Sequence, residues 1–346
     1  MKALMLVSAD AGPALRTAVH EGTRPEPEFI TLEREYGVRL LDWSRAGIEP
    51  GRSARRSARH VAAALAQVAV ADAIFSDGEH VGIPMGIAMR TVGPHRPHVV
   101  LGHHLTSRSK PHVLRWLRHM GISRVLVHST AQLKIALESL GFTRHSARFE
   151  PYYADSRFWS PTTGEAGDII VSAGREHRDY VTLASAVEEL GVPTVIAAGS
   201  LYSPDAMCRV PEMLPANVSV GMRNHTELRS LYERAAVVVV PLVPNDFQAG
   251  VTTLLEAMAM GRPVVVSATE GQRDIVVDGE TGLVVPAGDS HAMRDTIRRL
   301  LDDPGERRRL GANARDAVLS RFDLPLYAAR LYGHLREVGG PARQAA

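Results

Sequence analysis

Short apolar runs alternate along this chain with stretches in which apolar residues recur every three or four positions. The short runs predict buried strands, and the periodic stretches predict amphipathic helices between them. The predicted strands are Ala3–Val7, Ala73–Phe75, His98–Leu101, Arg124–His128, Ile169–Ala173, Thr194–Ala198, Asn217–Val220, Val237–Val240 and Val264–Ser267. The predicted helices include His60–Ala71, Pro111–His119, Thr226–Ala235 and Arg321–Val338. Strands that alternate with helices favour an α/β fold with doubly wound parallel sheets.

Length and composition narrow the class of protein. A chain of 346 residues is long for one core and suits two domains. A net charge of +2 gives no general attraction to nucleic acid. The single cysteine, Cys208, excludes an intrachain disulfide and fits a reducing compartment, so we expect a cytoplasmic protein. No apolar run approaches the ~20 residues that a membrane-spanning helix needs.

The most informative segment covers residues 247–286 and reads as a loop, a helix, a strand, a glycine turn and a second strand. The loop over residues 249–253 opens the helix, and Gly261 and Pro263 end it. Backbone N–H groups at a helix N-terminus bind anions, and Glu256 lies one or two turns further on, within reach of a ligand hydroxyl. This combination favours a sugar diphosphate ligand over a protein partner.

The same segment resembles the donor-binding motif of retaining GT-B glycosyltransferases of the family 4 type, also called glycosyl transferases group 1. The resemblance rests on LEAMA at 255–259, GRPV at 261–264 and DGETGLVVP at 278–286. An ordinary βα unit with an alanine-rich helix would explain the helix, but not the whole ordered string. The resemblance implies the GT-B fold, in which two Rossmann-like domains with doubly wound parallel sheets face a cleft.

The resemblance also implies a role for each part of the chain. Residues 1–153 would form an N-terminal acceptor-binding domain, and residues 154–322 a C-terminal nucleotide-sugar-binding domain. Residues 323–346 would contain a helix that crosses back to the N-terminal domain, followed by a flexible tail. Relatives have a glycine-rich loop after the first strand, and Gly12 is the one glycine of the corresponding loop here.

Several residues match donor contacts of the family. Arg175 follows a predicted strand, and its guanidinium can bridge two diphosphate oxygens. Relatives have a lysine near position 180, where this chain has tyrosine, and we expect Arg178 to replace that charge; a capping or surface arginine is the alternative. Glu256 would accept both ribose hydroxyls. The other expected donor-binding residues are Ala249, Gly250, Val251, Thr252 and Thr253 near the diphosphate, and Met222 and Arg223 near the base.

At two positions expected near the transferred sugar, the match to the family is incomplete or ambiguous. Relatives have an acid where this chain has Gln248, and a glutamine offers one carbonyl and two donors instead of a carboxylate. The substitution implies altered sugar preference, replacement by the nearby Asp246, or loss of turnover. Relatives also place a histidine near the reacting carbon, at the end of a strand where this chain has His103 and His104. A histidine pair satisfied by backbone groups is the alternative there.

Together these features predict a retaining hexosyltransferase that moves a sugar from a nucleotide-diphosphate sugar to a hydroxyl of a polysaccharide, lipid or small metabolite. The expected catalytic residues are His103, His104, Arg175, Gln248 and Glu256. No Asp-x-Asp pair occurs in the sequence, so a metal-independent site without a cofactor is expected. A nucleotide-sugar-binding pseudoenzyme that partners another transferase is the main alternative. This chain has no suggestive carboxylate pair, which an epimerase would need. It also has no Gly-x-Gly-x-x-Gly after its first strand, which a Rossmann oxidoreductase would have.

The sequence contains two basic stretches, Arg45–His60 and Arg108–His119, and it does not decide whether they contact a membrane. The second stretch mixes Trp116 and leucines with cations, as a helix that lies on the inner face of a membrane does. A solvated helix face is the alternative reading of both stretches. No nucleic acid partner is expected.

Overall fold

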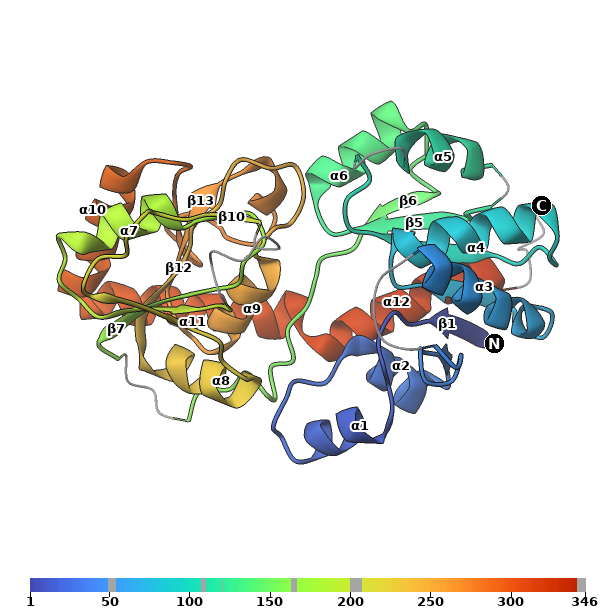
Figure 1. Cartoon of the computed structure of the whole chain (residues 1–346), viewed down its shortest axis with the longest axis horizontal. Helices are drawn as coiled ribbons and strands as arrows, with labels where there is room; N and C mark the ends of the chain where they lie inside the picture. The colour runs from blue at the N-terminus through green and yellow to red at the C-terminus, as the bar shows by residue number, and fades with distance from the viewer. Residues whose placement is uncertain (49–53, 107–109, 120, 163–166, 200–206, 341–346) are drawn as a thin grey trace. The chain divides into compact units, whose positions relative to one another are not determined.

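The computed structural model describes residues 1–48, 54–106, 110–119, 121–162, 167–199 and 207–340. The chain forms two compact units (Figure 1). Unit 1 comprises Met1–Glu21, Glu26–Pro151 and Pro325–Ala346, and unit 2 comprises Gly22–Pro25 and Tyr152–Leu324.

Unit 1 is built on a six-stranded sheet in which every neighbouring pair is parallel. In spatial order the strands are β2 (Arg39–Leu41), β1 (Ala3–Leu6), β3 (Ala73–Ser76), β4 (His98–Gly102), β5 (Arg124–Val127) and β6 (Ala147–Phe149). The helices are α1 (Pro13–His20), α2 (Glu28–Tyr36), α3 (Ala54–Val68), α4 (Glu79–Thr91), α5 (Lys110–Leu117), α6 (Thr130–Lys134) with a π-helical turn at Ile135–Ser139, and α12 (Leu324–Gly339). Strands β1, β3, β4 and β5 are buried along their whole length, which explains their mostly apolar sequences.

Unit 2 repeats this architecture with a second six-stranded parallel sheet. Its strands are, in spatial order, β11 (Val218–Gly221), β9 (Thr194–Ala197), β7 (Ile169–Ala173), β12 (Ala235–Val240), β13 (Val264–Ala268) and β14 (Leu283–Pro286). A small pair is formed by β8 (Arg178–Asp179) and β10 (Cys208–Arg209). The helices are α7 (Tyr180–Glu188), α8 (His225–Arg234), α9 (Val251–Ala259), α10 (Ser290–Asp302) and α11 (Pro304–Ala317), with a 3₁₀ turn at Glu270–Gln272 and a π-helical turn at Val318–Phe322.

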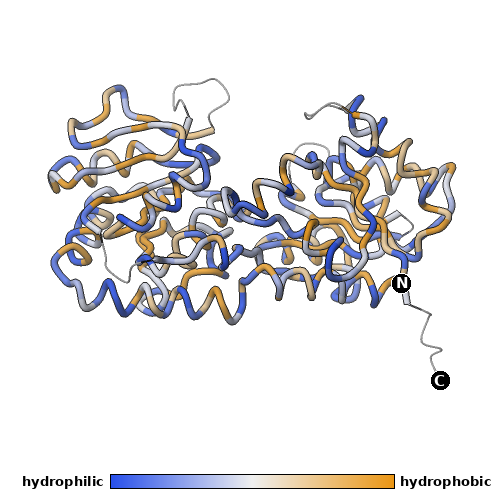
Figure 2. The backbone as a smooth tube through the Cα atoms, turned by 90° about the horizontal axis from the view of Figure 1, so that it is seen from below, coloured by the Kyte–Doolittle hydropathy of each residue, from blue (hydrophilic) through white to orange (hydrophobic). Residues whose placement is uncertain are grey.

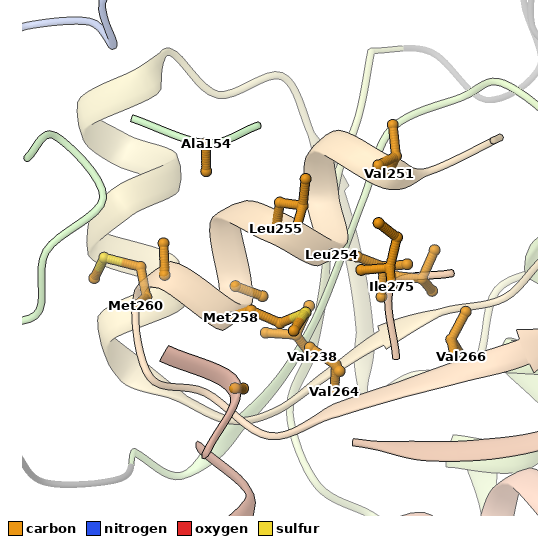
Figure 3. Close-up of a cluster of buried hydrophobic side chains, with 14 of the residues drawn as sticks. Ala154, Val238, Val251, Leu254, Leu255, Met258, Met260, Val264, Val266 and Ile275 are labelled. Carbon is orange, nitrogen blue, oxygen red and sulfur yellow. The ribbon is translucent and has the colours of Figure 1, made fainter. Parts of the chain in front are cut away.

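Helix α9 contributes to the core of unit 2 on nearly every side. Its apolar side chains pack with residues of β12, β13 and the segment after them, as Figure 3 shows for Leu254, Leu255, Met258, Val238, Val264 and Ile275. Each fully buried leucine or methionine contributes about 1.5–3 kcal/mol to folding. Thr252 is exposed and Glu256 is half-buried, so these two side chains mark the face of α9 that the core leaves open.

The predicted α/β architecture with parallel sheets is confirmed, and most predicted strands agree with the structure to within two residues. Helix α3 begins at Ala54, six residues before the predicted start. The prediction missed these residues because the first turns are polar and arginine-rich and lack an apolar period. Helix α12 begins at Leu324 and not at the predicted Arg321, because the preceding π-helical turn ends at Phe322 and Asp323 is extended. Of the basic residues noted above, Arg52 and Arg108 lie outside the described residues, as does the tail at 341–346.

The hydropathy of the backbone follows the layers of each unit. Figure 2 shows apolar stretches along the strands and polar stretches along the outer turns of the helices. Within the described ranges, none of the helices combines the length and the apolar character that crossing a membrane requires.

Helix α12 is held to unit 1 by a network of charged groups around the buried Glu150 and Arg124. Glu150, which is 2% exposed, accepts hydrogen bonds from Arg330 Nε at 2.6 Å and from His334 Nε2 at 3.1 Å. The buried Arg124 donates to His334 Nδ1 at 3.0 Å and to the Glu337 carboxylate at 2.6 Å. Since a buried charge without a partner is costly, α12 is an integral part of unit 1.

Candidate functional site

The first part of the site lies where β7, β9 and β11 of unit 2 end. Gly174 follows β7 in a left-handed conformation (φ 91°), and the exposed Arg175 comes next. A Cβ atom added at Gly199, after β9, would lie 3.6 Å from Arg175 Nη1 and 3.5 Å from Met222 Cε. The side chains of Arg175 and Met222 therefore both lie beside Gly199.

Arg178 occupies a different place from Arg175. It is 3% exposed, and its guanidinium donates to Ala173 O at 2.9 Å, to Glu176 O at 2.7 Å and to Thr253 Oγ1 at 3.2 Å. Burial lowers the pKa of this guanidinium, while the nearby tyrosines and Glu176 act in the opposite direction. Arg178 is thus neither a capping nor a surface arginine. Its hydrogen bonds link the end of β7, at Ala173, to the first turn of α9, at Thr253. Contact with a diphosphate stays a prediction for this residue.

The N-terminus of α9 is the second part of the site. Its cap is Gly250, with φ of 80°, and a Cβ atom at this position would lie 2.8 Å from Val240 Cγ1. Glycine is needed here for both its conformation and its size. The cap has no side chain and the first turn contains no acid, so nothing in that turn competes with an anion for the helix N-terminus. Ala249, Val251 and Thr253 are buried, and Thr252 is exposed.

Glu256 lies one turn further along α9, beside a tyrosine. The Tyr232 hydroxyl donates to Glu256 Oε2 at 3.2 Å, and Tyr232 itself is completely buried against Trp159, with 5.6 Å between ring centroids. Burial raises the pKa of the Glu256 carboxyl to about 8, although the Tyr232 hydrogen bond and the Arg178 charge both act to lower it. The carboxyl group is therefore largely protonated near neutral pH without a ligand.

Gln248 lies in the loop that leads to α9. Its residue is half-buried, and both its amide oxygen and its amide nitrogen are shielded from solvent without a hydrogen-bond partner in the described part of the chain. The neighbouring Phe247 contacts the ring of His177 edge-on, with 4.8 Å between centroids. His177 has φ of 53°, a conformation that costs on the order of 1 kcal/mol and that clusters at functional sites.

The two candidate histidines lie in unit 1 at the end of β4. The exposed His103 donates from Nε2 to Asp77 O at 2.9 Å, and the backbone N–H of His104 donates to Glu79 Oε1 at 2.7 Å. Burial alone would raise the pKa of Glu79, but His103, Lys110 and the His104 amide together lower it below its usual value. Glu79 is therefore an anion that fixes the loop containing both histidines.

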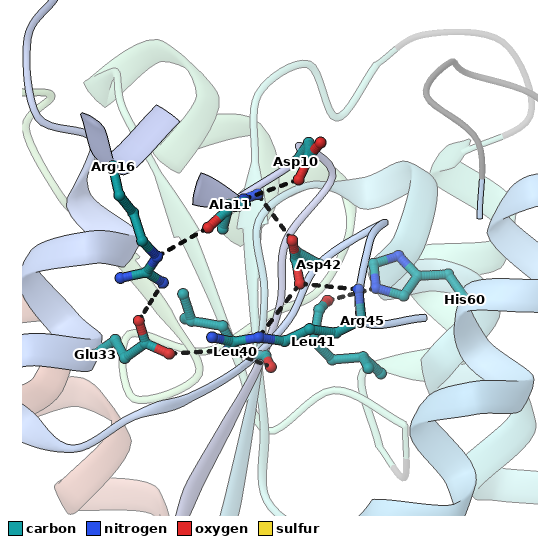
Figure 4. Close-up of polar contacts among 10 residues, drawn as sticks. Asp10, Ala11, Arg16, Glu33, Leu40, Leu41, Asp42, Arg45 and His60 are labelled. Carbon is teal, nitrogen blue, oxygen red and sulfur yellow. Dashed lines mark hydrogen bonds and ion pairs between the residues drawn. The ribbon is translucent and has the colours of Figure 1, made fainter. Parts of the chain in front are cut away.

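The loop after β1 is fixed by carboxylates. Ser8 donates from its hydroxyl to Asp77 at 2.8 Å, and the backbone N–H of Ala11 donates to Asp42 at 2.8 Å (Figure 4). Gly12 donates its N–H to Asp10 Oδ1 at 2.8 Å and caps α1. A Cβ atom at Gly12 would meet the same Asp10 oxygen at 2.8 Å, so the single glycine of this loop allows the tight turn.

Sequence reasoning did not identify Tyr232, Asp77 and Glu79 as members of these sites. Tyr232 is the one aromatic residue of helix α8, and nothing in the sequence of that helix indicates that its hydroxyl contacts Glu256. Asp77 and Glu79 directly follow β3, and the carboxyl end of a parallel strand is where functional side chains gather. Of the His, Cys, Asp and Glu residues whose placement is described, no three are grouped so as to bind a metal ion.

Comparison with known sequences supports the resemblance found in the second half of the chain. Residues 212–317 match the model of the family described as glycosyl transferases group 1. The alpha-D-kanosaminyltransferase of Streptomyces kanamyceticus is 33% identical over 119 residues, which are 34% of this chain and 30% of that protein. The GDP-mannose-dependent alpha-mannosyltransferase of Mycobacterium tuberculosis is 28% identical over 243 residues, which are 65% of this chain and 60% of that protein.

Comparison with solved structures concerns the fold. Sucrose-phosphate synthase from Thermosynechococcus elongatus superposes with a TM-score of 0.70 and 18% identity, covering 97% of this chain and 99% of that one. The Anabaena protein Alr3699/HepE in complex with UDP-glucose gives a TM-score of 0.72 and 17% identity, covering 97% and 100% of the two chains. At such identities the likeness shows the fold alone, and the predicted GT-B fold is confirmed.

Proposed function

We propose that the protein, whose residues 212–317 match the family model of glycosyl transferases group 1, transfers a sugar from a nucleotide-diphosphate sugar to an acceptor hydroxyl, with retention and without a metal ion. The observation that supports this most directly is the glycine-capped start of α9, with Arg175 exposed after β7 and Glu256 six residues beyond the cap. The helix N-terminus and the arginine suit a diphosphate, and the carboxyl group suits ribose. The acceptor is a polysaccharide, a lipid or a small metabolite that unit 1 binds.

The proposed reaction is balanced without an external base. The bond between the anomeric carbon and the donor phosphate oxygen breaks, and its electron pair leaves with the diphosphate. A bond from the anomeric carbon to the acceptor oxygen forms on the same face, and the acceptor proton moves to the leaving phosphate. Negative charge grows on the diphosphate during this step, so the Arg175 guanidinium and the N-terminus of α9 stabilise the transition state more than the ground state.

Binding of a nucleotide sugar should raise the melting temperature, and Glu256→Ala should abolish most of the increase. A ligand at a hundred times its Kd stabilises the native state by about 2.7 kcal/mol. The measurement is a thermal-shift screen of UDP-, GDP- and dTDP-sugars with the wild type and the variant. Glu188→Ala, which removes an exposed carboxylate from α7, is the matched control and should keep the full increase. If none of the nucleotide sugars raises the melting temperature, the proposed donor site is refuted.

Gln248 supports a second candidate function, a nucleotide-sugar-binding protein without turnover. Its amide replaces the acid of the relatives, and neither end of the amide has a partner among the described residues. The two functions differ in one observable. Release of the free nucleotide from the donor, by transfer or hydrolysis, supports the enzyme, whereas donor binding without release under any acceptor supports the binding protein.

Gln248→Glu should change the donor preference by roughly 10- to 100-fold. A site that pairs an amide with a substrate group loses that pairing when the amide becomes a carboxylate, which accepts hydrogen bonds only. The measurement is the ratio of kcat/KM values for neutral, acetamido and uronic acid donors in both proteins. Asp246→Asn is tested alongside, since a loss of activity there and no effect of Gln248→Glu would assign the sugar contact to Asp246.

A further inference from the structure

The charges of unit 1 are distributed very unevenly along the chain. The 58 residues from His80 to Leu137 contain eight lysines and arginines and no aspartate or glutamate. At the average of this chain, which has 38 acids in 346 residues, about six acids would be expected there. The stretch includes α5 and nearly all of α4, whose first residue is the buried Glu79. These two helices therefore have no exposed acid of their own.

Helices α4 and α5 cover one face of the sheet of unit 1, and α12 covers the other (Figure 1). Val125 of β5 belongs to the same apolar cluster as Leu114 of α5, whereas the neighbouring Arg124 contacts His334 of α12. Successive side chains of a strand point to opposite faces of the sheet, so α5 and α12 lie on opposite sides. The acid-free helices thus form one side of unit 1 only.

Helices α4 and α5 share a continuous surface. A Cβ atom added at Gly86 of α4 would lie 3.2 Å from Leu117 Cδ1 of α5, so the two helices approach closely there. Arg90 of α4 donates from Nη1 to Trp116 O at 3.1 Å, and its guanidinium lies 4.1 Å from the centroid of the Trp116 ring, in a cation–π contact. Around this contact lies a basic face that consists of Ile87, Arg90, Val92, Arg115, Trp116 and Arg118.

The arginines of the basic face have no carboxylate partner among the described residues. Arg115 donates from Nε to Ser139 O at 2.9 Å, and Arg118 donates from Nη1 to Arg115 O at 2.9 Å. Glu138 is exposed and adjoins Ser139, but it forms no ion pair within the described ranges. Each of the three guanidinium groups, including that of Arg90, uses a single nitrogen for carbonyl groups and keeps further donors for an anion.

The basic face also exposes three large apolar side chains. Val92 is 78% exposed, Trp116 is 44% exposed and Ile87 is 37% exposed. Ile87 lies one turn before Arg90 on α4, and Val92 is the residue at which that helix ends. Tryptophan and aliphatic side chains among arginines are typical of a surface that lies in the headgroup region of an anionic bilayer. A nucleic acid would pair with the arginines and leave the aliphatic side chains in water.

We propose that the basic face docks unit 1 on a bilayer that contains anionic phospholipids. The arginines pair with lipid phosphates, and Ile87, Val92 and Trp116 enter the headgroup region. Each arginine near such a surface increases partitioning onto the bilayer by roughly fivefold. This docking goes beyond the proposed sugar transfer and does not depend on it, since a binding protein without turnover would dock in the same way.

The test is co-sedimentation of the full-length protein with vesicles of phosphatidylcholine alone and with vesicles that contain phosphatidylglycerol in equal amount. We expect binding to the mixed vesicles only, and weaker binding as sodium chloride is added, because salt screens exposed charges. The double substitution Arg90→Gln and Arg115→Gln should lower the partition coefficient by about 25-fold. The matched double substitution Arg90→Lys and Arg115→Lys keeps both charges and should retain most of the binding.

Arg336→Gln, which removes an exposed arginine of α12 on the opposite side of the sheet, is the control and should bind like the wild type. The fluorescence emission of the wild type should shift to shorter wavelength on mixed vesicles, because the Trp116 indole leaves water, and Trp116→Phe should lose this shift.

The inference is overturned if the mixed vesicles bind no better than phosphatidylcholine, if the double glutamine variant binds like the wild type, or if the emission of bound protein is unchanged. Binding of duplex DNA as tightly as mixed vesicles would assign the face to a nucleic acid instead. A dimer that forms without vesicles and that the glutamine variant dissociates, as measured by analytical ultracentrifugation, would assign the face to a second copy of this chain.

Discussion

Arg175→Ala should lower kcat by roughly 100- to 1,000-fold, the effect of removing one donor that stabilises charge developing in a transition state. Arg175 is exposed at the end of β7, so the variant should fold normally. Arg175→Lys keeps the charge but not the planar fork that bridges two phosphate oxygens, and it should recover only part of the rate. The measurement is initial velocity at saturating donor and acceptor.

Arg308→Ala, which removes another exposed arginine of unit 2 on α11, provides the control and should retain full activity. A variant of Arg175 that raised KM for the donor and left kcat unchanged would show that the residue binds ground state and transition state equally. Such a result would move the stabilisation of the leaving diphosphate to other groups, with the N-terminus of α9 first among them.

Glu256→Gln should make unit 2 more stable than the wild type at alkaline pH, by roughly 3–5 kcal/mol above pH 8. In the folded chain the pKa of Glu256 is raised from 4.5 to about 8 by burial. Between these two values the unfolded chain has released the proton and the folded chain still binds it, so the stability of the wild type falls as pH rises. Below about pH 4.5 both states are protonated, and the two proteins should be similarly stable.

The measurement is urea unfolding followed by the fluorescence of Trp159, which packs against Tyr232, in a background where Trp43 and Trp116 are phenylalanine. Titration of unit 1 does not disturb this reading, although burial lowers the pKa of His98 to about 4 and of His128 to about 3 in that unit. A difference between the two proteins that stays constant from pH 5 to 9 would contradict the raised pKa.

The sequence predicted the parts of the structure that depend on local patterns. Strands such as Ala235–Val240 are continuous apolar runs, and the turn at Gly261 follows from a residue that adopts φ of 65°. The order of loop, helix and strand around α9 also came from the sequence, because each step has its own signal. The glycine cap of α9 is one such signal, although its steric reason, the contact with Val240, is visible only in the fold.

The environment of each site residue could not be predicted, because it depends on neighbours that are distant in the sequence. Arg175 and Arg178 are equivalent as cations in the string GREHRDY, yet one is exposed and the other is 3% exposed beneath α9. The partner of Glu256 is Tyr232, on a helix 24 residues earlier.

The fastening of α12 determines the order in which the chain becomes complete during synthesis. All of Tyr152–Leu324 emerges from the ribosome before Arg330, His334 and Glu337, so unit 2 can fold while unit 1 still lacks one helix. Until then Arg124 and Glu150 have none of their α12 partners and stay hydrated, because burying them alone is too costly. Unit 1 can therefore become complete only after the whole of unit 2 has been synthesised.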